Sequence, residues 1–335
     1  MPLVIPIFIP HQGCPQQCLF CNQVSISGQR PGKKDDVERV GRTVEEWLGF
    51  ASQQEEVQLA FYGGSFTCLP PERQESYLGA VRPYLDDGRV HSIRLSTRPD
   101  CVDEEICDFL LEYGVKTVEL GVQSFDNRVL AAAERGHDSD ASLRAASVLT
   151  AKGLTLGIQL MPGLPMESSR SFCATLAGTI SCNPDFVRLY PTLVINGSRL
   201  AELYRRGLYR PMSMARAIVV CSLAKTRLEA AGIKVLRMGL QASESLEDEL
   251  VAGPYHPAFG ECVAARQWFL RIRRLLVAVP AGKMLHVTVS HRDMSAIVGH
   301  ARKNMIRLEQ LGLLQRMKLI TDKRLKRGTL NYVIN

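Results

Sequence analysis

The sequence lacks a long apolar run. Across its 335 residues, no stretch approaches the roughly 18 consecutive apolar residues that a membrane span needs. The apolar start, residues 1–10, is interrupted by Pro2, Pro6 and Pro10 and has no basic leader, which argues against a secretory signal peptide. We therefore expect a cytoplasmic protein with no membrane partner.

The sequence also lacks a low-complexity linker and any internal repeat beyond a strand–helix period. Its composition, 46% hydrophobic and 22% charged, is that of an ordinary soluble chain, and its length predicts one large domain with an appendage. We expect residues 1–240 to form the large domain and residues 241–335 the small one. Ten cysteines in a cytoplasmic chain of this size favour thiols and metal ligands over a disulfide framework.

Excess charge is absent from most of the chain. The net charge is +7, from 41 basic and 34 acidic residues. Residues 300–335 contain nine basic and two acidic side chains, a difference of +7, so the first 299 residues are neutral overall. A positive field concentrated at one end suits a polyanionic partner, with a solvated basic face as the alternative.

Strand and helix patterns alternate over the first 200 residues. Apolar, β-branched runs predict six strands, each followed by a helical pattern, at 3–9, 57–62, 90–96, 117–122, 154–160 and 186–190. Repeated strand–helix units imply a parallel sheet with right-handed crossovers. The predicted fold class is α/β, a partial or complete parallel (β/α) barrel, in which chemistry lies on the loops after the strands.

The C-terminal region reads as a small basic α+β unit. We expect a helix near 292–311, then a hairpin formed by residues 313–320 and 330–334 around a basic turn at 323–328. Such a helix and hairpin would form a phosphate-tracking surface. The basic side chains that we expect to contact nucleic acid are Arg302, Lys303, Arg307, Lys323, Arg324, Lys326 and Arg327.

Three cysteines in the loop after the first strand carry the strongest chemical signal. Cys14, Cys18 and Cys21 are separated by three and two residues. Thiolates at such short spacing can wrap one corner of an iron–sulfur cubane and leave its fourth iron free for another ligand. The alternatives are three buried reduced thiols and a structural zinc site with His11 as the fourth ligand. The other seven cysteines, including Cys68 and Cys101, show no comparable grouping and read as core or incidental residues.

This cysteine spacing, together with the glycine pair after the second strand, resembles the radical S-adenosylmethionine (SAM) superfamily. The resemblance implies a [4Fe-4S] cluster on Cys14, Cys18 and Cys21, whose open iron binds the methionine part of SAM. It further implies that reductive cleavage of SAM yields a 5′-deoxyadenosyl radical. An electron donor such as flavodoxin or ferredoxin is then an expected partner.

Other motifs are similar to those by which coproporphyrinogen oxidase-like members hold SAM. By that resemblance, Gln123 hydrogen-bonds the ribose and Arg135 binds the methionine carboxylate. Gln159 stands where those enzymes have an aspartate ligand to the ribose. The remaining cofactor-binding residues implied are Gly63, Gly64, Ser65 and Ser96.

A narrower resemblance covers most of the chain. The motifs around Tyr62, Thr97, Gln123 and Arg135, and above all the run 188–195, resemble the radical SAM domain of the Elongator catalytic subunit. That family modifies the wobble uridine of tRNA. The three-residue gap between the first two cysteines is shorter than in that family, and the sequence ends where the family's acetyltransferase domain would begin.

These features favour a radical SAM enzyme that modifies an RNA base, with tRNA as the expected partner. Carboxymethyl chemistry is not implied, because no acyl-coenzyme A module is recognised. Two alternatives stay open at this stage. One is a radical SAM oxidase or transferase acting on a small or porphyrin-like molecule, and the other is a non-catalytic, zinc-stapled RNA-binding module.

Overall fold

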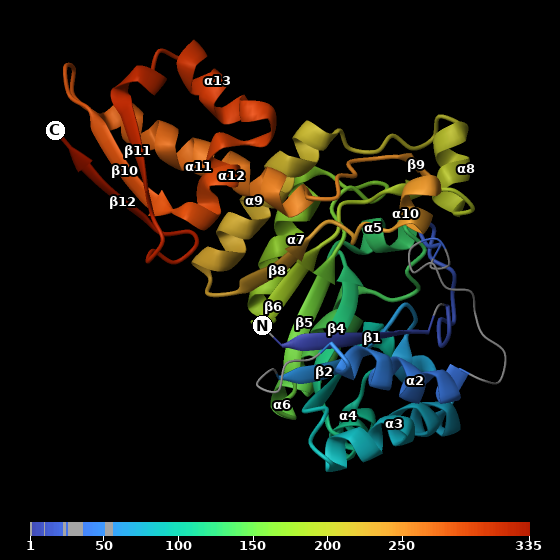
Figure 1. The fold of residues 1–335 in the computed structure, drawn as a ribbon. Helices are drawn as coiled ribbons and strands as arrows, with labels where there is room; N and C mark the ends of the chain where they lie inside the picture. Colours follow the sequence, from blue (N-terminus) through green and yellow to red (C-terminus); the bar gives the residue numbers. More distant parts are fainter. Residues whose placement is uncertain (1, 10, 23–24, 26–35, 51–55) are drawn as a thin grey trace. The chain divides into compact units, whose positions relative to one another are not determined.

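The computed structural model describes residues 2–9, 11–22, 25, 36–50 and 56–335 (Figure 1). The chain divides into two compact units. Unit 1 comprises Met1–Ser213 and Thr226–Tyr255, and unit 2 comprises Met214–Lys225 and His256–Asn335. Within the described residues, no helix is long and apolar enough to span a membrane.

Unit 1 is built on one seven-stranded sheet with the order β1-β2-β3-β4-β5-β6-β8. Every neighbouring pair in this sheet is parallel. The strands are β1 (Leu3–Phe8), β2 (Val57–Tyr62), β3 (Ser92–Thr97), β4 (Val115–Gln123), β5 (Thr155–Leu160), β6 (Phe186–Leu189) and β8 (Lys234–Met238). The sheet is open, since β1 and β8 are its two edges. The predicted α/β class is therefore confirmed in its partial-barrel form.

Helices connect these strands, as parallel pairing requires. They are α2 (Asp36–Leu48), α3 (Pro71–Asp86), α4 (Glu104–Glu112), α5 (Asn127–Ala132), α6 (Ser139–Ala151), α7 (Ser169–Ser181), α8 (Arg199–Arg205) and α9 (Met214–Ala230), and a further helix, α10 (Glu244–Asp248), follows β8. Figure 1 shows α2, α3 and α4 beside the early strands β1 and β2. Three of these helices begin directly after a capping residue. Asp103, Asp138 and Ser168 each accept a hydrogen bond from a backbone N–H in the first turn of the helix that follows.

The two faces of this sheet differ in chemistry. One face is apolar and fully buried, with residues such as Leu59, Leu95 and Ile158. The other face carries polar side chains, two of which show that the sheet curls. Arg188 on β6 donates to the hydroxyl of Tyr62 on β2 over 3.2 Å. Because three strands lie between these two, and strands are spaced about 4.8 Å apart, this contact requires a concave polar face.

Two short strands and two 3₁₀ helices also belong to unit 1. The strands β7 (Val194–Ile195) and β9 (Leu250–Ala252) pair in an antiparallel sheet. The 3₁₀ helices η1 (Phe66–Cys68) and η2 (Pro99–Cys101) follow the carboxyl ends of β2 and β3.

Unit 2 contains a three-stranded sheet and a small apolar core. Its principal elements are α11 (Phe259–Ala278), β10 (Leu285–Ser290), α12 (Met294–Val298), α13 (Lys303–Gln310), β11 (Met317–Asp322) and β12 (Leu330–Ile334). Trp268 and Ile272 of α11 pack with Leu285 and Val287 of β10. Helix α11 was not predicted from the sequence, although its buried residues recur every four or five positions.

Two predictions for this region are wrong. The strands at 317–322 and 330–334 do not form a hairpin, because β10 lies between them, parallel to β11 and antiparallel to β12. The helix expected at 292–311 is broken into α12 and α13. Gly299, Ala301 and Arg302 adopt positive φ values at the break, and Asn304 donates its amide to the carbonyls at the end of α12.

Candidate cofactor site

The cysteine segment is anchored by the apolar residues between its thiols. Leu19 is buried in a cluster with Val194 and Leu200, and its backbone N–H donates to the carbonyl of Ala133 over 3.1 Å. The carbonyl of Leu19 accepts from the N–H of Leu200 over 2.8 Å. The segment is thereby fixed against the ends of α5 and α8, at the carboxyl edge of the sheet.

Two glycines, one in the cysteine segment and one after β2, allow the backbones of these two loops to approach each other closely. A Cβ at Gly64 would lie 2.4 Å from the carbonyl oxygen of Gln12, and a Cβ at Gly13 would lie 2.1 Å from the carbonyl oxygen of Ser65. The N–H of Ser65 donates to Gln12 over 2.9 Å. Only residues without a side chain fit this contact, so these glycines hold two site loops together.

The two serines predicted to contact the cofactor, Ser65 and Ser96, differ in how deeply they are buried. Ser65 is fully buried, and its hydroxyl already bonds the Thr97 hydroxyl at 3.0 Å and accepts from the N–H of Arg98 at 3.1 Å. Ser96 is half-buried on β3. The Ser65 side chain thus joins the loops after β2 and β3.

A disulfide joins the same two loops. Cys68 and Cys101, which the sequence analysis treated as incidental, are bonded to each other. That interpretation is therefore wrong for this pair. A signal was available, because both cysteines follow strands that are neighbours in the sheet, and loops after adjacent parallel strands lie side by side. Within the described residues, the other eight cysteines form no disulfide.

Arg135 connects the cysteine segment to the sheet. It lies beyond the end of α5 and is buried. Its Nη1 donates to the Sγ of Cys18 over 3.0 Å, and its Nη2 donates to the carbonyl of Gly121 on β4. Its Nε has no partner among the described residues.

Three further buried atoms around Arg135 also lack partners within the described residues: Gln123 Oε1, His137 Nε2 and Arg98 Nη1. Gln123 has a φ of 67° next to a bulge in the β4–β5 pairing, and this conformation directs its side chain. Burial, followed by the nearby Arg135 charge, lowers the pKa of His137 to about 4, so its ring is neutral at pH 7. Unsatisfied buried polar atoms are expected where a polar ligand completes the site.

The three cysteines lie on one short segment, but their thiols are not arranged as a metal site. In the described part of the chain, no three histidine, cysteine or carboxylate side chains converge to hold a metal ion. Burial and then the neighbouring Cys18 raise the pKa of Cys14, and the guanidinium groups of Arg135 and Arg98 oppose that rise. In the chemical type of their donors, although not in the present arrangement of the thiols, the residues fit a thiolate-held cluster with a polar ligand beside it. The soft donors are there, and cations flank them.

Glu119 forms a second polar centre, on the concave face of the sheet, that sequence reasoning missed. This fully buried carboxylate pairs with Arg94 at 2.9 Å and with Arg188 at 2.8 Å. The hydroxyl of Tyr62 donates to it at 3.1 Å and the Nε2 of Gln159 at 3.2 Å. Gln159, predicted to face the cofactor, is thus engaged with Glu119. Charged residues inside otherwise apolar strands were the available signal.

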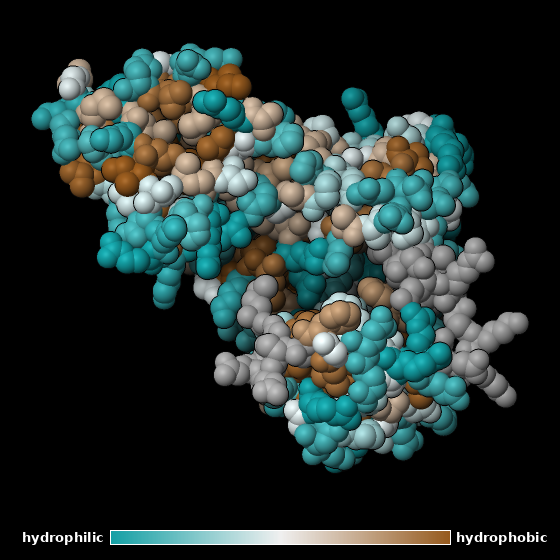
Figure 2. Space-filling view, in the orientation of Figure 1, coloured by the Kyte–Doolittle hydropathy of each residue, from teal (hydrophilic) through white to brown (hydrophobic). Residues whose placement is uncertain are grey.

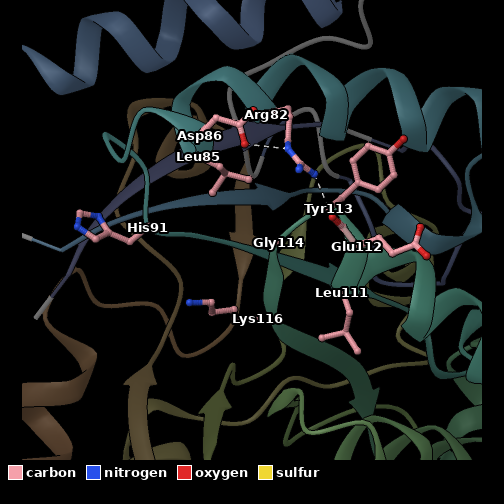
Figure 3. A pocket seen from close by; sticks show the side chains of 9 residues that line it. All are labelled: Arg82, Leu85, Asp86, His91, Leu111, Glu112, Tyr113, Gly114 and Lys116. Carbon is pink, nitrogen blue, oxygen red and sulfur yellow. Dashed lines mark hydrogen bonds and ion pairs between the residues drawn. The ribbon is translucent and has the colours of Figure 1, made fainter.

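The pocket drawn in Figure 3 lies at the other edge of the sheet. Its wall includes His91, which precedes β3, and Gly114, which precedes β4, so it opens at the amino ends of these strands. Arg82 crosses it, bonded to Asp86 and to the carbonyl of Glu112. It is therefore separate from the cysteine segment, which lies at the carboxyl edge.

The seven basic residues predicted to contact nucleic acid are all exposed in unit 2. Three are engaged within the unit. Arg324 pairs with Asp322 at 3.3 Å, Arg327 pairs with Glu261, and Arg307 stacks over the ring of Phe269. The hairpin expected to carry the basic turn does not exist. Residues 323–329 connect β11 to β12 past the intervening β10.

The sequence pattern of the Radical SAM superfamily matches residues 8–177, and that of the Radical_SAM C-terminal domain matches residues 184–269. The chain therefore belongs to the radical SAM superfamily and is a radical SAM family enzyme. This membership favours the enzyme over the zinc-stapled binding module. The family implies a [4Fe-4S] cluster and SAM as cofactors.

Curated relatives point to one branch. The chain is 26% identical over 261 residues to the tRNA uridine(34) acetyltransferase of Methanocaldococcus jannaschii, covering 67% of this chain and 48% of the relative. It is 29% identical over 180 residues to Elongator complex protein 3 of Mus musculus, covering 48% of this chain and 33% of that protein. The chain thus spans about half or less of the length of these relatives.

Solved structures share the fold. The archaeal Elp3 of Methanocaldococcus infernus superposes with a TM-score of 0.62 at 24% identity, covering 81% of this chain and 63% of that one. Coproporphyrinogen III oxidase from Escherichia coli gives a TM-score of 0.52 at 18% identity, covering 80% and 58%. Both resemblances identified from the sequence are confirmed at the level of family and fold.

Proposed function

We propose that this protein is a radical SAM enzyme that cleaves SAM at a [4Fe-4S] cluster and modifies a tRNA base. The relatives named as tRNA uridine(34) acetyltransferases support the substrate class. The basic residues of unit 2 support a polyanionic partner. Cys14, Cys18 and Cys21 would supply the thiolates, on a segment fixed by Leu19 and by the glycine contacts.

The observation that carries this proposal is the position of Arg135. Its guanidinium donates to the Cys18 sulfur and keeps one buried N–H free. A cation there can offset the negative charge of a cluster held by thiolates and can also bind a carboxylate next to it. When bound, the cluster would supply one electron to SAM and so release a 5′-deoxyadenosyl radical.

Arg135, Gln123 and the glycine pair would bind and orient SAM. Arg135 Nε would donate to the methionine carboxylate, and Gln123 Oε1 would accept from a ribose hydroxyl, because both atoms are buried without a partner in the described structure. The backbone at Gly63 and Gly64 would accept the methionine ammonium. Neutral His137 would contribute no positive charge beside Arg135 at pH 7.

The test is an anaerobic assay for 5′-deoxyadenosine with SAM and a strong reductant, with and without bulk tRNA. We expect about four iron and four sulfide per chain, SAM cleavage, stimulation by tRNA, and loss of cleavage in Cys18→Ala. Cys173→Ala, which removes a free cysteine of α7, is the matched control. One zinc per chain and no cleavage would overturn the proposal. Cleavage that tRNA does not stimulate would instead favour a small-molecule substrate.

A further inference from the structure

The concave face of the unit 1 sheet carries a group of polar side chains from neighbouring strands. Neighbouring strands contribute residues in register, since Ser96 pairs with Glu119 and Gln159 pairs with Arg188. In the backbone register, Arg188 lies opposite Arg237 of β8, whose guanidinium donates to the carbonyl of Gly239 at 3.3 Å and to Oε1 of Gln241 at 3.2 Å. The interior of a closed (β/α) barrel is normally filled by branched apolar side chains. Polar side chains here indicate a surface built to contact a ligand.

The charge of this group is positive. Arg94, Arg188 and Arg237 carry three positive charges and Glu119 carries one negative charge, which leaves +2 on these four groups. Glu119 is held from both sides by Arg94 and Arg188. The Nε of Arg94, a residue only 7% exposed, has no partner among the described residues. The carboxylate therefore does not satisfy the guanidinium groups around it.

Solvent reaches this face although the strands are central. Gln159, Arg188 and Tyr190 are half-buried, whereas Ile158 and Leu189, the alternate residues on the same strands, are fully buried. Figure 2 shows a hollow in unit 1, between the surface formed by α2 and that formed by α8, with hydrophilic side chains on much of its wall. These polar side chains are thus accessible to a ligand of some size.

Tyrosine hydroxyls flank the arginines and remain protonated. Arg188 donates to the hydroxyl of Tyr190 at 3.4 Å and to that of Tyr62 at 3.2 Å. Burial and then the Glu119 charge raise the pKa of Tyr62, which stays a neutral phenol. The face therefore offers guanidinium and hydroxyl donors with a single competing carboxylate, the donor set that binds phosphate or carboxylate groups.

We propose that this concave face is an anion-binding substrate pocket in which Arg188 binds a phosphate or carboxylate group of the substrate. Arg94 shares the Glu119 carboxylate with Arg188 and adds a second positive charge to the face. The inference rests on the proposed function in that it assigns a charge to the substrate of the radical reaction. The proposal implies that Glu119 lowers the affinity for the anion, because the negative charge of Glu119 repels that of the ligand.

The experiment is isothermal titration calorimetry on the full chain with three probes: inorganic phosphate, acetate and uridine 5′-monophosphate, with uridine as the uncharged reference. We expect the anions to bind and uridine 5′-monophosphate to bind more tightly than uridine. The order of phosphate and acetate identifies which anion the pocket prefers. No binding of any anion would overturn the proposal.

Substitutions can show whether these residues bind an anion or only stabilise the fold. Arg188→Gln should weaken anion binding by about tenfold or more, since a charge-assisted contact is lost, whereas Arg188→Lys should retain most of it. Glu119→Gln should strengthen binding, because it removes the opposing charge. The exposed Arg144 of α6 provides the control, and Arg144→Gln should bind like the unmodified protein. Equal anion affinity in Arg188→Gln and Arg188→Lys, or weaker binding in folded Glu119→Gln, would overturn the proposal.

SAM affinity, measured on the same variants, distinguishes the two sites. We expect Arg188→Gln to bind SAM as the unmodified protein does. If it loses SAM instead of the anion, Arg188 belongs to the cofactor site and the pocket proposal is wrong. Failure to cleave SAM in any preparation would count against the proposed function and would leave the anion titration as an independent result.

Discussion

Buried polar atoms without partners concentrate around Arg135. Its Nε, the Oε1 of Gln123 and the Nε2 of His137 all lack partners within the described residues, and each is next to or near the cysteine segment. Leaving a buried donor unsatisfied costs about 1–3 kcal/mol per group. Several such atoms in one place indicate that ligand binding, and not folding alone, accounts for these residues.

Replacing Arg135 by glutamine should weaken SAM binding without preventing cluster assembly. The loss of a charge-assisted hydrogen bond, about 1.5–3 kcal/mol, corresponds to roughly 10- to 150-fold in affinity. Equilibrium dialysis against SAM, with iron and sulfide counted in the same sample, measures both properties. Arg128→Gln is the control, because Arg128 is an exposed arginine of α5 that pairs with Asp126. Unchanged SAM affinity in Arg135→Gln would contradict the assigned role.

His137 should make the fold less stable in mild acid. Its folded-state pKa is about 4, below the value of about 6.5 expected when unfolded. Between these values the unfolded chain binds a proton that the folded chain does not, so stability falls as pH drops from about 6.5 towards 4. Urea unfolding of the metal-free protein at pH 7 and pH 5 should show a smaller loss for His137→Gln than for the unmodified chain. An equal loss in both would rule this out.

Contacts between loops hold together the carboxyl edge of the sheet. The cysteine segment rests on the backbone after β2, and the loops after β2 and β3 share the Ser65–Thr97 hydrogen bond and a disulfide. None of these contacts is within one strand–helix unit. Each depends on which strands are neighbours in the sheet.

Gly64→Ala should disrupt cluster assembly while leaving the sheet folded. The added Cβ would lie 2.4 Å from Gln12 and 2.6 Å from Ile9, both backbone oxygens that cannot move aside without moving the cysteine segment. We expect a large loss of iron after anaerobic reconstitution, with an unchanged circular dichroism spectrum. Gly79→Ala in α3 is the matched control, since nothing lies within 4 Å of its Cβ and the change should stabilise the helix by about 0.5–1 kcal/mol. Full iron content in Gly64→Ala would refute this account.

The sequence predicted those parts of the fold that local pattern specifies. The six strands from 3–9 to 186–190 were predicted within a few residues, because each is a short segment rich in apolar and β-branched residues. The Glu119 network and the Cys68–Cys101 bond were not, because their partners come from different strands and meet only when the sheet curls. The break between α12 and α13 was missed because it depends on Asn304 contacts with two other segments.

The excess positive charge of the protein is carried by its C-terminal region, residues 300–335. The net charge of the last 36 residues equals that of the entire chain. Intramolecular pairs use part of it, since Arg324 and Arg327 have carboxylate partners. Lys323 and Lys326 are exposed on the connection between β11 and β12, and they are the better candidates for phosphate contacts.

The double variant Lys323→Gln/Lys326→Gln should weaken tRNA binding and reduce its salt dependence. Each lost phosphate contact should lower the slope of log affinity against log salt by about 0.7–0.9. Filter binding at several salt concentrations measures that slope. The control is Arg144→Gln/Arg170→Gln, which removes the same charge from exposed positions on α6 and α7. Identical slopes for both double variants would show that charge in general, and not this region, determines binding.

The bond between Cys68 and Cys101 has a practical consequence for biochemistry on this enzyme. Dithiothreitol in a purification buffer would open it, whereas gas exclusion alone would not, so two laboratories could handle covalently different proteins under equally oxygen-free conditions. The opened form would lose the covalent tie between the glycine-pair loop and its neighbour. Turnover values are therefore comparable only between samples whose free thiols have been counted by alkylation and mass spectrometry.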